Sequence, residues 1–439
     1  MKIFFYRYGS IMEPDIIDTF YEFGFEVLEY TKEVTDKNYL PGKAVREVSA
    51  VLQENPCDIA FSINFFPFLS DVCNIFHIRY VSWTVDSPVM ELYSKQIKNE
   101  WNRTFIFDKA DFDDVSPFNP GHIFHLPLGA NTGKKEILFS HQSIPNIAEA
   151  SVNQYISQNL KSKGEKFEDM GRWRNGYNVG FSNVVKNSDI QKFSHDVAFV
   201  GSLYSEKCPY DKLSPKAPAS LRGYLDGIMA AQERVYGYYF IDELLSDEVV
   251  EEFKKYHPSF YHDPSASELL TDRRTLSQLY IANKITANER LHTFKCLSEH
   301  FDTSIYTASD TSSLSKIHNR GLAKTLTEMP LIFHYSKINI NTTSKAIRTG
   351  LPLRIFDIMS AGGFCLSTYQ AEIPELFSVG EEIVLYSSYE ELMDLTSYYL
   401  FHDEERREIA AAGFERVKKD YSLEKQIEKM MLMAYGQEA

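Results

Sequence analysis

Residues 2–30 read KIFFYRYGSIMEPDIIDTFYEFGFEVLEY, and this stretch decides the fold class. Lys2–Tyr8 is an apolar run of strand length, and Pro14–Phe23 spaces its apolar residues as a helix does before Gly24. A second apolar run follows at Phe25–Tyr30. Strand, helix and strand in this order predict the start of an α/β domain with parallel strands.

The same alternation continues through the first 130 residues. The next predicted helix is Lys43–Glu54, and four further strands are predicted at Asp58–Asn64, Ile78–Val85, Thr104–Asp108 and Ile123–Leu128. These strands are largely apolar, as the strands of a buried parallel sheet are. Residues 133–190 break the pattern because they are rich in Lys, Asn, Ser and Gln. We expect an irregular insertion or interdomain segment there, with a role in acceptor binding as the alternative.

A second α/β unit is predicted from Asp196–Val200 onward. A helical stretch covers about 218–300, and the later strand candidates are Ser304–Tyr306, Ile338–Ile340, Phe364–Leu366 and Ile383–Tyr386. Ser388–Glu391 has the spacing of a capping box and starts a helix to about Leu400. Asp403–Lys419 and Leu423–Tyr435 are predicted as amphipathic helices.

The predicted architecture is two Rossmann-like domains facing a cleft, with a helical insertion in the C-terminal half. The expected boundaries are an N-terminal domain at 1–132, the irregular segment at 133–190 and a C-terminal domain at 191–420. The last segment, 421–439, is expected to be a helix that packs back on the N-terminal domain.

Composition limits the classes of function. The 439 residues are 44% apolar, enough for two cores, and their formal net charge is −15. This acidic balance argues against nucleic acid or a membrane surface as the main partner. Five cysteines without a CxxC pair favour a reducing compartment over a disulfide framework or zinc site. No apolar run has the roughly 18–20 residues of a membrane span. We therefore expect a cytoplasmic protein.

Small or polar residues follow five of the predicted strands. They are Gly9-Ser10, Asn64, Asp86-Ser87, Gly201-Ser202 and Asn341-Thr342. Ligands of open parallel sheets bind at the carboxyl ends of the strands. Facing sheets would bring these residues to opposite walls of one crevice, and the alternative is that each pair only makes a turn.

The stretch 338–377 has the most informative pattern. A strand ends at Asn341, a loop containing Gly350 follows, and a helix then carries Arg354 and Asp357. Amide groups at a helix start suit a diphosphate, and Arg354 adds the geometry for a bidentate phosphate contact. A carboxylate at Asp357 suits the ribose hydroxyls. An Arg–Asp pair that only stabilises the helix is an equally open alternative.

These residues also carry a family resemblance. Arg354–Asp357, Ser360–Gly363 and Ile373–Phe377 resemble the C-terminal signature of the CgeB-like glycosyltransferases, which have the GT-B fold and are related to glycosyltransferase group 1. His195–Tyr204 resembles the opening strand and loop of that family's C-terminal domain. The N-terminal half resembles the DUF3880 domain that accompanies it, and the matching residues are Asn64–Pro67, Trp83–Pro88 and His125–Leu128.

The resemblance implies a GT-B glycosyltransferase whose C-terminal domain holds a nucleotide-sugar donor, most often a UDP-sugar. The donor-binding residues expected there are Gly201, Ser202, Asn341, Thr342, Gly350, Arg354 and Asp357. The expected acceptor-side residues are Gly9, Ser10 and Asn64. Such enzymes need no metal or other cofactor. The acceptor is open: a polysaccharide, a protein or a small molecule.

The resemblance also leaves points of difference. Asp357 takes the place of the ribose-binding second glutamate of the group 1 E-x7-E motif, whereas Thr349 stands where the first glutamate would be. Group 1 enzymes retain configuration, so retention is slightly favoured; an inverting reaction needs a base, for which Asp86 is the candidate. Helix capping is the alternative role for Asp86. The D-x-D spellings in Asp111–Asp114 are expected to be a solvated turn. A binding or scaffold protein without activity is the alternative to an enzyme.

Overall fold

The computed structural model describes residues 1–36, 39–133, 187–261 and 270–436. These residues form two compact units, each built on a six-stranded sheet of parallel strands. Unit 1 contains 1–107, 111–187 and 420–439, and unit 2 contains 108–110 and 188–419. The α/β prediction with two Rossmann-like sheets is confirmed. Most of the segment 133–190 lies outside the described residues.

The sheet of unit 1 has the strand order β2-β1-β3-β4-β5-β6. Its strands are β1 (Lys2–Tyr6), β2 (Glu26–Tyr30), β3 (Ile59–Ile63), β4 (Arg79–Trp83), β5 (Asn102–Ile106) and β6 (Ile123–His125). The chain moves outward from β1 to β2, then returns across β1 to β3 and continues in the opposite direction. Because crossovers between parallel strands are right-handed, this reversal places helices on both faces of the sheet.

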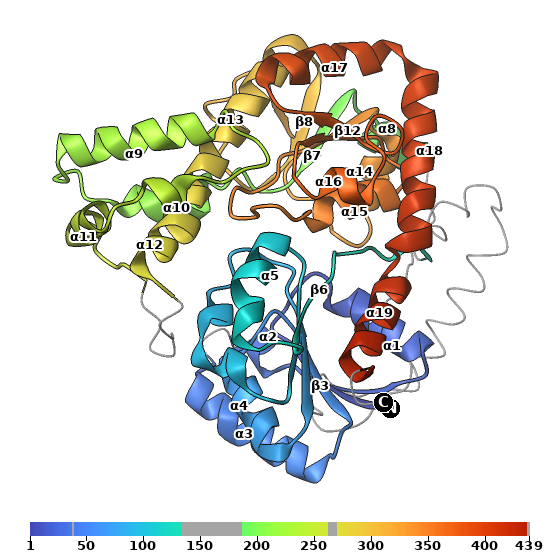
Figure 1. Cartoon of the computed structure of the whole chain (residues 1–439). Coiled ribbons are helices and arrows are strands. Elements are labelled where there is room, and N and C mark those ends of the chain that lie inside the picture. The colour runs from blue at the N-terminus through green and yellow to red at the C-terminus, as the bar shows by residue number, and fades with distance from the viewer. Residues whose placement is uncertain (37–38, 134–186, 262–269, 437–439) are drawn as a thin grey trace. The chain divides into compact units, whose positions relative to one another are not determined.

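The helices of unit 1 are short and cover that sheet (Figure 1). They are α1 (Glu13–Glu22), α2 (Lys32–Thr35), α3 (Pro41–Glu54), α4 (Pro67–Phe76), α5 (Lys109–Val115) and α19 (Leu423–Tyr435), with 3-10 turns at Met90–Tyr93, Lys95–Lys98 and Ser116–Phe118. Gly24 has φ +73° just after the end of α1, as a residue that ends a helix should.

Helix α19 belongs to unit 1 although it follows unit 2 in the chain. It contacts α1, and its Tyr435 ring lies 4.0 Å from the guanidinium carbon of Arg79 on β4. Arg103 on β5 donates through Nε to the carbonyl of Ala434 at 3.3 Å. The last helix therefore satisfies two arginines of the central strands, β4 and β5.

The sheet of unit 2 has the order β12-β11-β10-β7-β8-β9. Its strands are β7 (Val197–Val200), β8 (Thr303–Tyr306), β9 (His318–Asn319), β10 (Ile338–Asn341), β11 (Cys365–Thr368) and β12 (Val384–Tyr386). The chain runs from β7 through β8 to β9, then crosses back to β10 on the other side of β7. Unit 2 thus repeats the reversal of unit 1, here between β7 and β10.

Helices surround this second sheet and also form a lobe beside it (Figure 1). They are α8 (Asn187–Phe193), α9 (Ala219–Gln232), α10 (Ile241–Leu244), α11 (Asp247–Tyr256), α12 (Asp272–Arg274), a π-helix (Thr275–Ile281), α13 (Ala282–His300), α14 (Met329–Tyr335), α15 (Leu353–Ser360), α16 (Ile373–Leu376), α17 (Tyr389–Phe401) and α18 (Asp403–Asp420), with 3-10 turns at Ser205–Lys207 and Pro209–Lys212. The helical insertion, residues 205–281, separates β7 from α13. It has a hydrophobic cluster of its own that reaches into the start of α13. The predicted helical insertion is confirmed.

Local predictions agree with most elements. Ser388 accepts a hydrogen bond from the amide of Glu391 at 3.1 Å, so the predicted N-cap of α17 is confirmed. The expected solvated turn at Asp111–Asp114 is wrong, because these residues lie in α5 and Asp111 is buried. Helix α4 was not predicted, since Pro67–Phe76 follows a strand without a polar cap; its N-cap residue makes no side-chain bond.

Glycine is required at one helix position where unit 2 is tightly packed. A methyl group on Gly413 of α18 would approach the carbonyl oxygen of Glu382 and lie 2.9 Å from Cε of Met359. We expect Gly413→Ala to cost about 1–3 kcal/mol by overpacking, seen as a lower midpoint of thermal unfolding. Gly227→Ala in α9 is the matched control, since its methyl meets nothing within 4 Å and should be neutral or stabilising. Equal midpoints for the two variants would contradict this packing.

Candidate functional site

The reversal of strand order in unit 2 opens the carboxyl edge of the sheet between β7 and β10. Open α/β sheets bind ligands at such a switch point, because the loops after the two strands leave in opposite directions. Gly201-Ser202 follows β7, while Asn341 is the last residue of β10 and Thr342 follows it. The topology therefore brings these two predicted pairs to one place in unit 2.

Arg290 of α13 joins the two loops. Its Nη1 donates to the carbonyl of Ser202 at 2.5 Å, and its Nη2 donates to the carbonyl of Thr342 at 2.7 Å. The guanidinium carbon lies 4.6 Å from the ring centroid of Tyr204, and the residue is 9% exposed. Burial lowers the pKa of Arg290. This charged, fork-shaped donor holds two backbone segments at once.

Two more residues on the same face of α13 contact the second loop, residues 342–352. The hydroxyl of Thr286 accepts from the amide of Lys345 at 2.9 Å. The carboxylate of Glu289 lies 3.3 Å from Nζ of Lys345. Residues 286, 289 and 290 have the i, i+3, i+4 spacing that puts side chains on one side of a helix. Helix α13 thus supports the first part of the loop, from Thr342 to Lys345.

The far end of the 342–352 loop is held by β11 and the segment after it. Gln370 donates through Nε2 to the carbonyls of Ile347 and Gly350, at 3.2 and 3.1 Å. Asn341 donates to the hydroxyl of Ser367 at 2.9 Å and is 2% exposed. Asn341 and Gly350 are therefore buried parts of the loop's own support, whereas Ser202 remains half-buried.

Arg354 and Asp357 lie one turn apart on α15, directly after this loop. Nη1 of Arg354 is 3.5 Å from Oδ2 of Asp357, and the two side chains are 22% and 17% exposed. The guanidinium carbon of Arg354 is 5.2 Å from the ring of Phe333, and burial lowers the pKa of Arg354. The intrahelical pair foreseen as the alternative is present but long. Both side chains keep some exposed surface with which to contact a ligand.

The side chain of Thr349 is hydrogen-bonded to a carboxylate from a distant part of the sequence. Asp108, which groups with unit 2, accepts from the hydroxyl of Thr349 at 2.9 Å and from the amide of Arg348 at 2.6 Å. Asp108 is fully buried. An acid thus lies beside the position where group 1 sequences carry a glutamate, although it arrives from a different segment.

The strand reversal in unit 1 brings together a second set of predicted residues. Asn64, at the end of β3, donates through Nδ2 to Oδ2 of Asp86 at 2.7 Å and to the hydroxyl of Tyr8 at 2.9 Å. Its Oδ1 accepts from the amide of Val85 at 3.0 Å. Asn64 has φ +58°, a left-handed conformation that asparagine tolerates better than most residues. Asn64 therefore ties the ends of β1, β3 and β4 together.

Asp86 is exposed at the end of this network. Burial, and then the charge of Asp86, raise the pKa of Tyr8, whose hydroxyl donates to Asp86 at 3.4 Å. The capping alternative for Asp86 is wrong, because the next helical turn is Met90–Tyr93 and its N-cap residue is Val89. Asp86 is therefore an exposed carboxylate whose Oδ2 is held by hydrogen bonds from Asn64 and Tyr8.

The backbone amides of Gly9 and Ser10, two residues expected on the acceptor side, are already hydrogen-bonded within the protein. Oε1 of Glu13 accepts from the amides of Tyr8, Gly9 and Ser10 at 2.9, 2.8 and 3.0 Å. Glu13 is itself paired through Oε2 with Arg7 at 2.9 Å. The amides after β1 therefore bind the protein's own carboxylate, and the loop is a rigid neighbour of Asn64 and Asp86.

The structure thus places the predicted residues in two groups, one in each unit. Sequence reasoning missed Arg290, Glu289 and Lys345 in unit 2 and Tyr8 in unit 1. The spacing of Thr286, Glu289 and Arg290 along α13 was visible in the sequence, but nothing marked that face as the one under the loops. Tyr8 directly precedes Gly9-Ser10 and could have been included with them.

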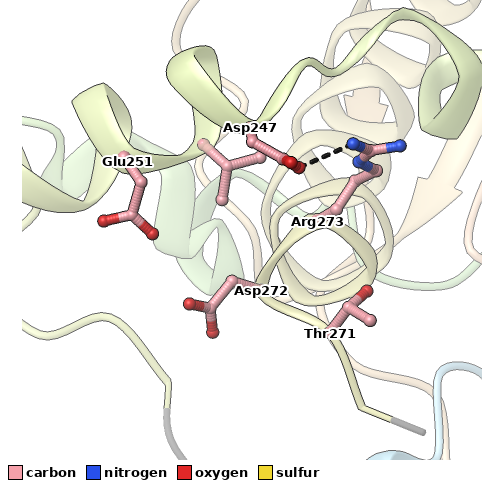
Figure 2. Close-up of a pocket in the computed structure, with 6 residues that line it drawn as sticks. Asp247, Glu251, Thr271, Asp272 and Arg273 are labelled. Carbon is pink, nitrogen blue, oxygen red and sulfur yellow. Dashed lines mark hydrogen bonds and ion pairs between the residues drawn. The ribbon is translucent and has the colours of Figure 1, made fainter. Parts of the chain in front are cut away.

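A hollow of about 370 Å³ lies elsewhere, in the helical insertion between α11 and α12 (Figure 2). Figure 2 shows Asp247 and Arg273 joined across it, at 2.6 Å, with Glu251 and Asp272 on its walls. None of the predicted site residues lines it. Within the described ranges, no group of three or more His, Cys, Asp or Glu side chains has the arrangement of a metal site. No helix among them is both long and apolar enough to cross a bilayer.

Comparison with known proteins agrees with the reading of unit 2. Residues 281–431 match the family model described as "Glycosyl transferase-like", so the chain contains a glycosyltransferase-like domain. This match includes α13, the 342–352 loop and α15. No curated protein matches the sequence.

Several solved structures are similar along nearly the whole chain. A glycosyltransferase from Rickettsia africae is 10% identical, with a TM-score of 0.46 over 99% of this chain and 98% of that one. HepE from Anabaena, in complex with UDP-glucose, is 10% identical, with a TM-score of 0.48 over 98% of each chain. Sucrose-phosphate synthase from Thermosynechococcus elongatus is 9% identical, with a TM-score of 0.49 over 100% of this chain and 98% of that one.

The bridging role of Arg290 makes a prediction about backbone mobility. In Arg290→Met both loops lose a charge-assisted hydrogen bond, each worth about 1.5–3 kcal/mol. Amide hydrogen exchange in 201–204 and 342–350 should then quicken by about tenfold or more. Arg222→Met is the control, because Arg222 also binds a carbonyl, that of Pro215, but on an exposed part of the insertion. Unchanged exchange in both loops would show that Arg290 does not hold them.

Proposed function

We propose that the protein is a glycosyltransferase that moves a sugar from a nucleotide diphosphate donor, a UDP-sugar by family resemblance, to an acceptor hydroxyl. The observation that carries this proposal is the switch point of unit 2. There Arg290 joins the loops after β7 and β10, and the second of these, 342–352, leads directly to Arg354 and Asp357 on α15. The match of residues 281–431 to a glycosyltransferase-like model includes Arg290, the 342–352 loop and α15.

In this proposal each part of the site has a separate role. The backbone amide of Gly350 and those at the start of α15, with Arg354, hold the diphosphate. Asp357 accepts hydrogen bonds from the ribose hydroxyls. The bond between C1 of the sugar and the diphosphate breaks through a transition state with oxocarbenium character, so negative charge develops on the departing diphosphate. Preorganised cations and helix dipoles stabilise that charge, and we propose that no metal ion is required.

The acceptor side is assigned to the cluster in unit 1. If the reaction inverts configuration, Asp86 takes the acceptor proton while Asn64 and Tyr8 hold its other oxygen in place. Retention remains slightly favoured, following group 1. Polysaccharides, proteins and small molecules all qualify as acceptors.

A protein that kept the fold but binds a nucleotide without transferring sugar is the second candidate. Thr349, in the position of the first glutamate, favours it. The buried carboxylate of Asp108 beside Thr349 counts against it, because an acid is still present at this point.

Calorimetric titration with UDP, GDP and UDP-sugars in EDTA tests the donor site. We expect micromolar binding of UDP that survives EDTA, and a loss of about tenfold or more in Asp357→Ala because two ribose hydrogen bonds disappear. Asp394→Ala, an exposed carboxylate on α17 of the same unit, should bind as the unaltered protein does. Failure to bind any nucleotide would overturn the transferase proposal.

Steady-state kinetics of donor turnover test the role of Asp86. Under the inverting scheme, Asp86→Asn should lower kcat by about 100-fold or more and leave the KM for the donor unchanged, since the base acts only on the acceptor. Asp36→Asn, a carboxylate of unit 1 outside the cluster, is the control. Equal kcat in Asp86→Asn and the unaltered enzyme would remove the base and leave retention as the scheme.

A further inference from the structure

Lys345 and Glu289 form a buried ion pair whose role the site described so far does not explain. Nζ of Lys345 lies 3.3 Å from Oε1 of Glu289, and the side chains are 12% and 1% exposed. Charge-assisted hydrogen bonds of this kind are usually about 2.7–2.9 Å long. Because removing two charges from water is expensive, a pair this loose stabilises the fold poorly.

Glu289 is surrounded by groups from several elements. They are Lys345 from the 342–352 loop, Glu233 and Tyr236 from the end of α9 and the segment after it, Arg290 from its own helix, Tyr386 from β12 and Tyr389 from α17. Burial has the largest effect and raises the pKa of Glu289, while the cation of Lys345 opposes it. The charge of Glu289 therefore depends on Lys345 staying close.

Lys345 belongs to the loop that the proposed donor would contact. The loop begins at Thr342, whose carbonyl Arg290 binds, and Gly350 lies near its end. Arg290 in turn is affected by the charges of both Glu289 and Arg354. Lys345, Glu289, Arg290 and Arg354 thus form one electrostatic group. A phosphate anion bound at this loop would attract Lys345 and repel Glu289.

We propose that Lys345 is a phosphate-binding lysine of the donor site and that Glu289 is a positioning residue that holds it until a nucleoside diphosphate binds. The inference rests on the proposed function. On binding, Lys345 exchanges the Glu289 carboxylate for a phosphate oxygen. Glu289, left buried without its cation, takes one proton from the solvent and becomes neutral. Donor binding is then coupled to proton uptake.

The coupling has a defined sign. The bound state holds more protons than the free state, so the affinity for UDP should fall as the pH rises through the range in which free Glu289 ionises. Calorimetry of UDP binding in two buffers with different ionisation enthalpies measures the protons taken up directly. We expect an uptake that approaches one proton per UDP where Glu289 is ionised in the free protein.

Three variants separate the two residues. Lys345→Met should weaken UDP binding by about tenfold or more and abolish proton uptake, whereas Lys345→Arg keeps a cation and should restore most of the affinity. Glu289→Gln should bind UDP at least as tightly as the unaltered protein, without proton uptake. Lys337→Met is the matched control, because Lys337 precedes β10 at the opposite edge of the sheet and pairs with Asp196.

The outcomes distinguish this inference from the proposed function. If the unaltered protein binds UDP and Lys345→Met binds it equally well, Lys345 is no phosphate ligand, yet the transferase proposal stands. If UDP binds with the same enthalpy in both buffers, no proton is taken up and the role proposed for Glu289 is wrong. If Lys345→Met does not fold, the nearly isosteric Glu289→Gln still decides the coupling. A protein that binds no nucleotide would overturn both proposals.

Discussion

Each sheet reverses its strand order beside its first strand, and the sites depend on this constraint. A parallel sheet that grows in one direction covers its carboxyl edge with successive crossovers. Reversal sends two neighbouring loops apart and leaves the strand ends between them accessible. In unit 1 the reversal lies between β1 and β3, where Asn64 is found; in unit 2 it lies between β7 and β10. The strand order therefore determines where ligand chemistry can develop.

Neighbouring loops that leave the sheet in opposite directions need hydrogen bonds that fix their positions. The two units supply these hydrogen bonds with different kinds of side chain. Unit 1 uses neutral and anionic groups, with Asn64 tying three strand ends and Glu13 binding the amides after β1. Unit 2 uses a buried cation, Arg290, which binds a carbonyl of each loop. The two supports therefore differ in charge, with a buried cation in unit 2 and neutral and anionic groups in unit 1.

The sequence predicted the fold closely because strands and helices carry local patterns. Buried parallel strands such as Ile59–Ile63 are continuous apolar runs, and Gly24 and Ser388 mark helix ends by their own chemistry. Helix α4 lacked such a mark, and the acids of Asp111–Asp114 suggested a turn where a helix forms. Hydrophobic periodicity did not predict α4, because this helix exposes few residues and its N-cap residue, Phe66, makes no capping hydrogen bond.

The site was predictable where residues follow strands, and on α15, the helix that comes after the loop following β10. Asn64, Ser202 and Thr342 could be found because topology fixes the position of strand ends. Arg290 and Lys345 could not, since their partners are backbone carbonyls and a buried acid more than 50 residues away in the chain. Asp108 shows the same limit: its contact with Thr349 joins segments separated by more than 200 residues.

The return of α19 to unit 1 has a consequence for synthesis on the ribosome. Arg79 of β4 and Arg103 of β5 gain their contacts with α19 only when the residues around Tyr435 have been made, although Arg103 also donates to the carbonyls of Glu100 and Asn102. Domains usually complete their folding in the order of translation. Here unit 2, residues 188–419, emerges whole while the N-terminal sheet still lacks its last helix. The part translated first is therefore the part finished last, and its sheet lacks the contacts that α19 supplies for as long as unit 2 takes to emerge.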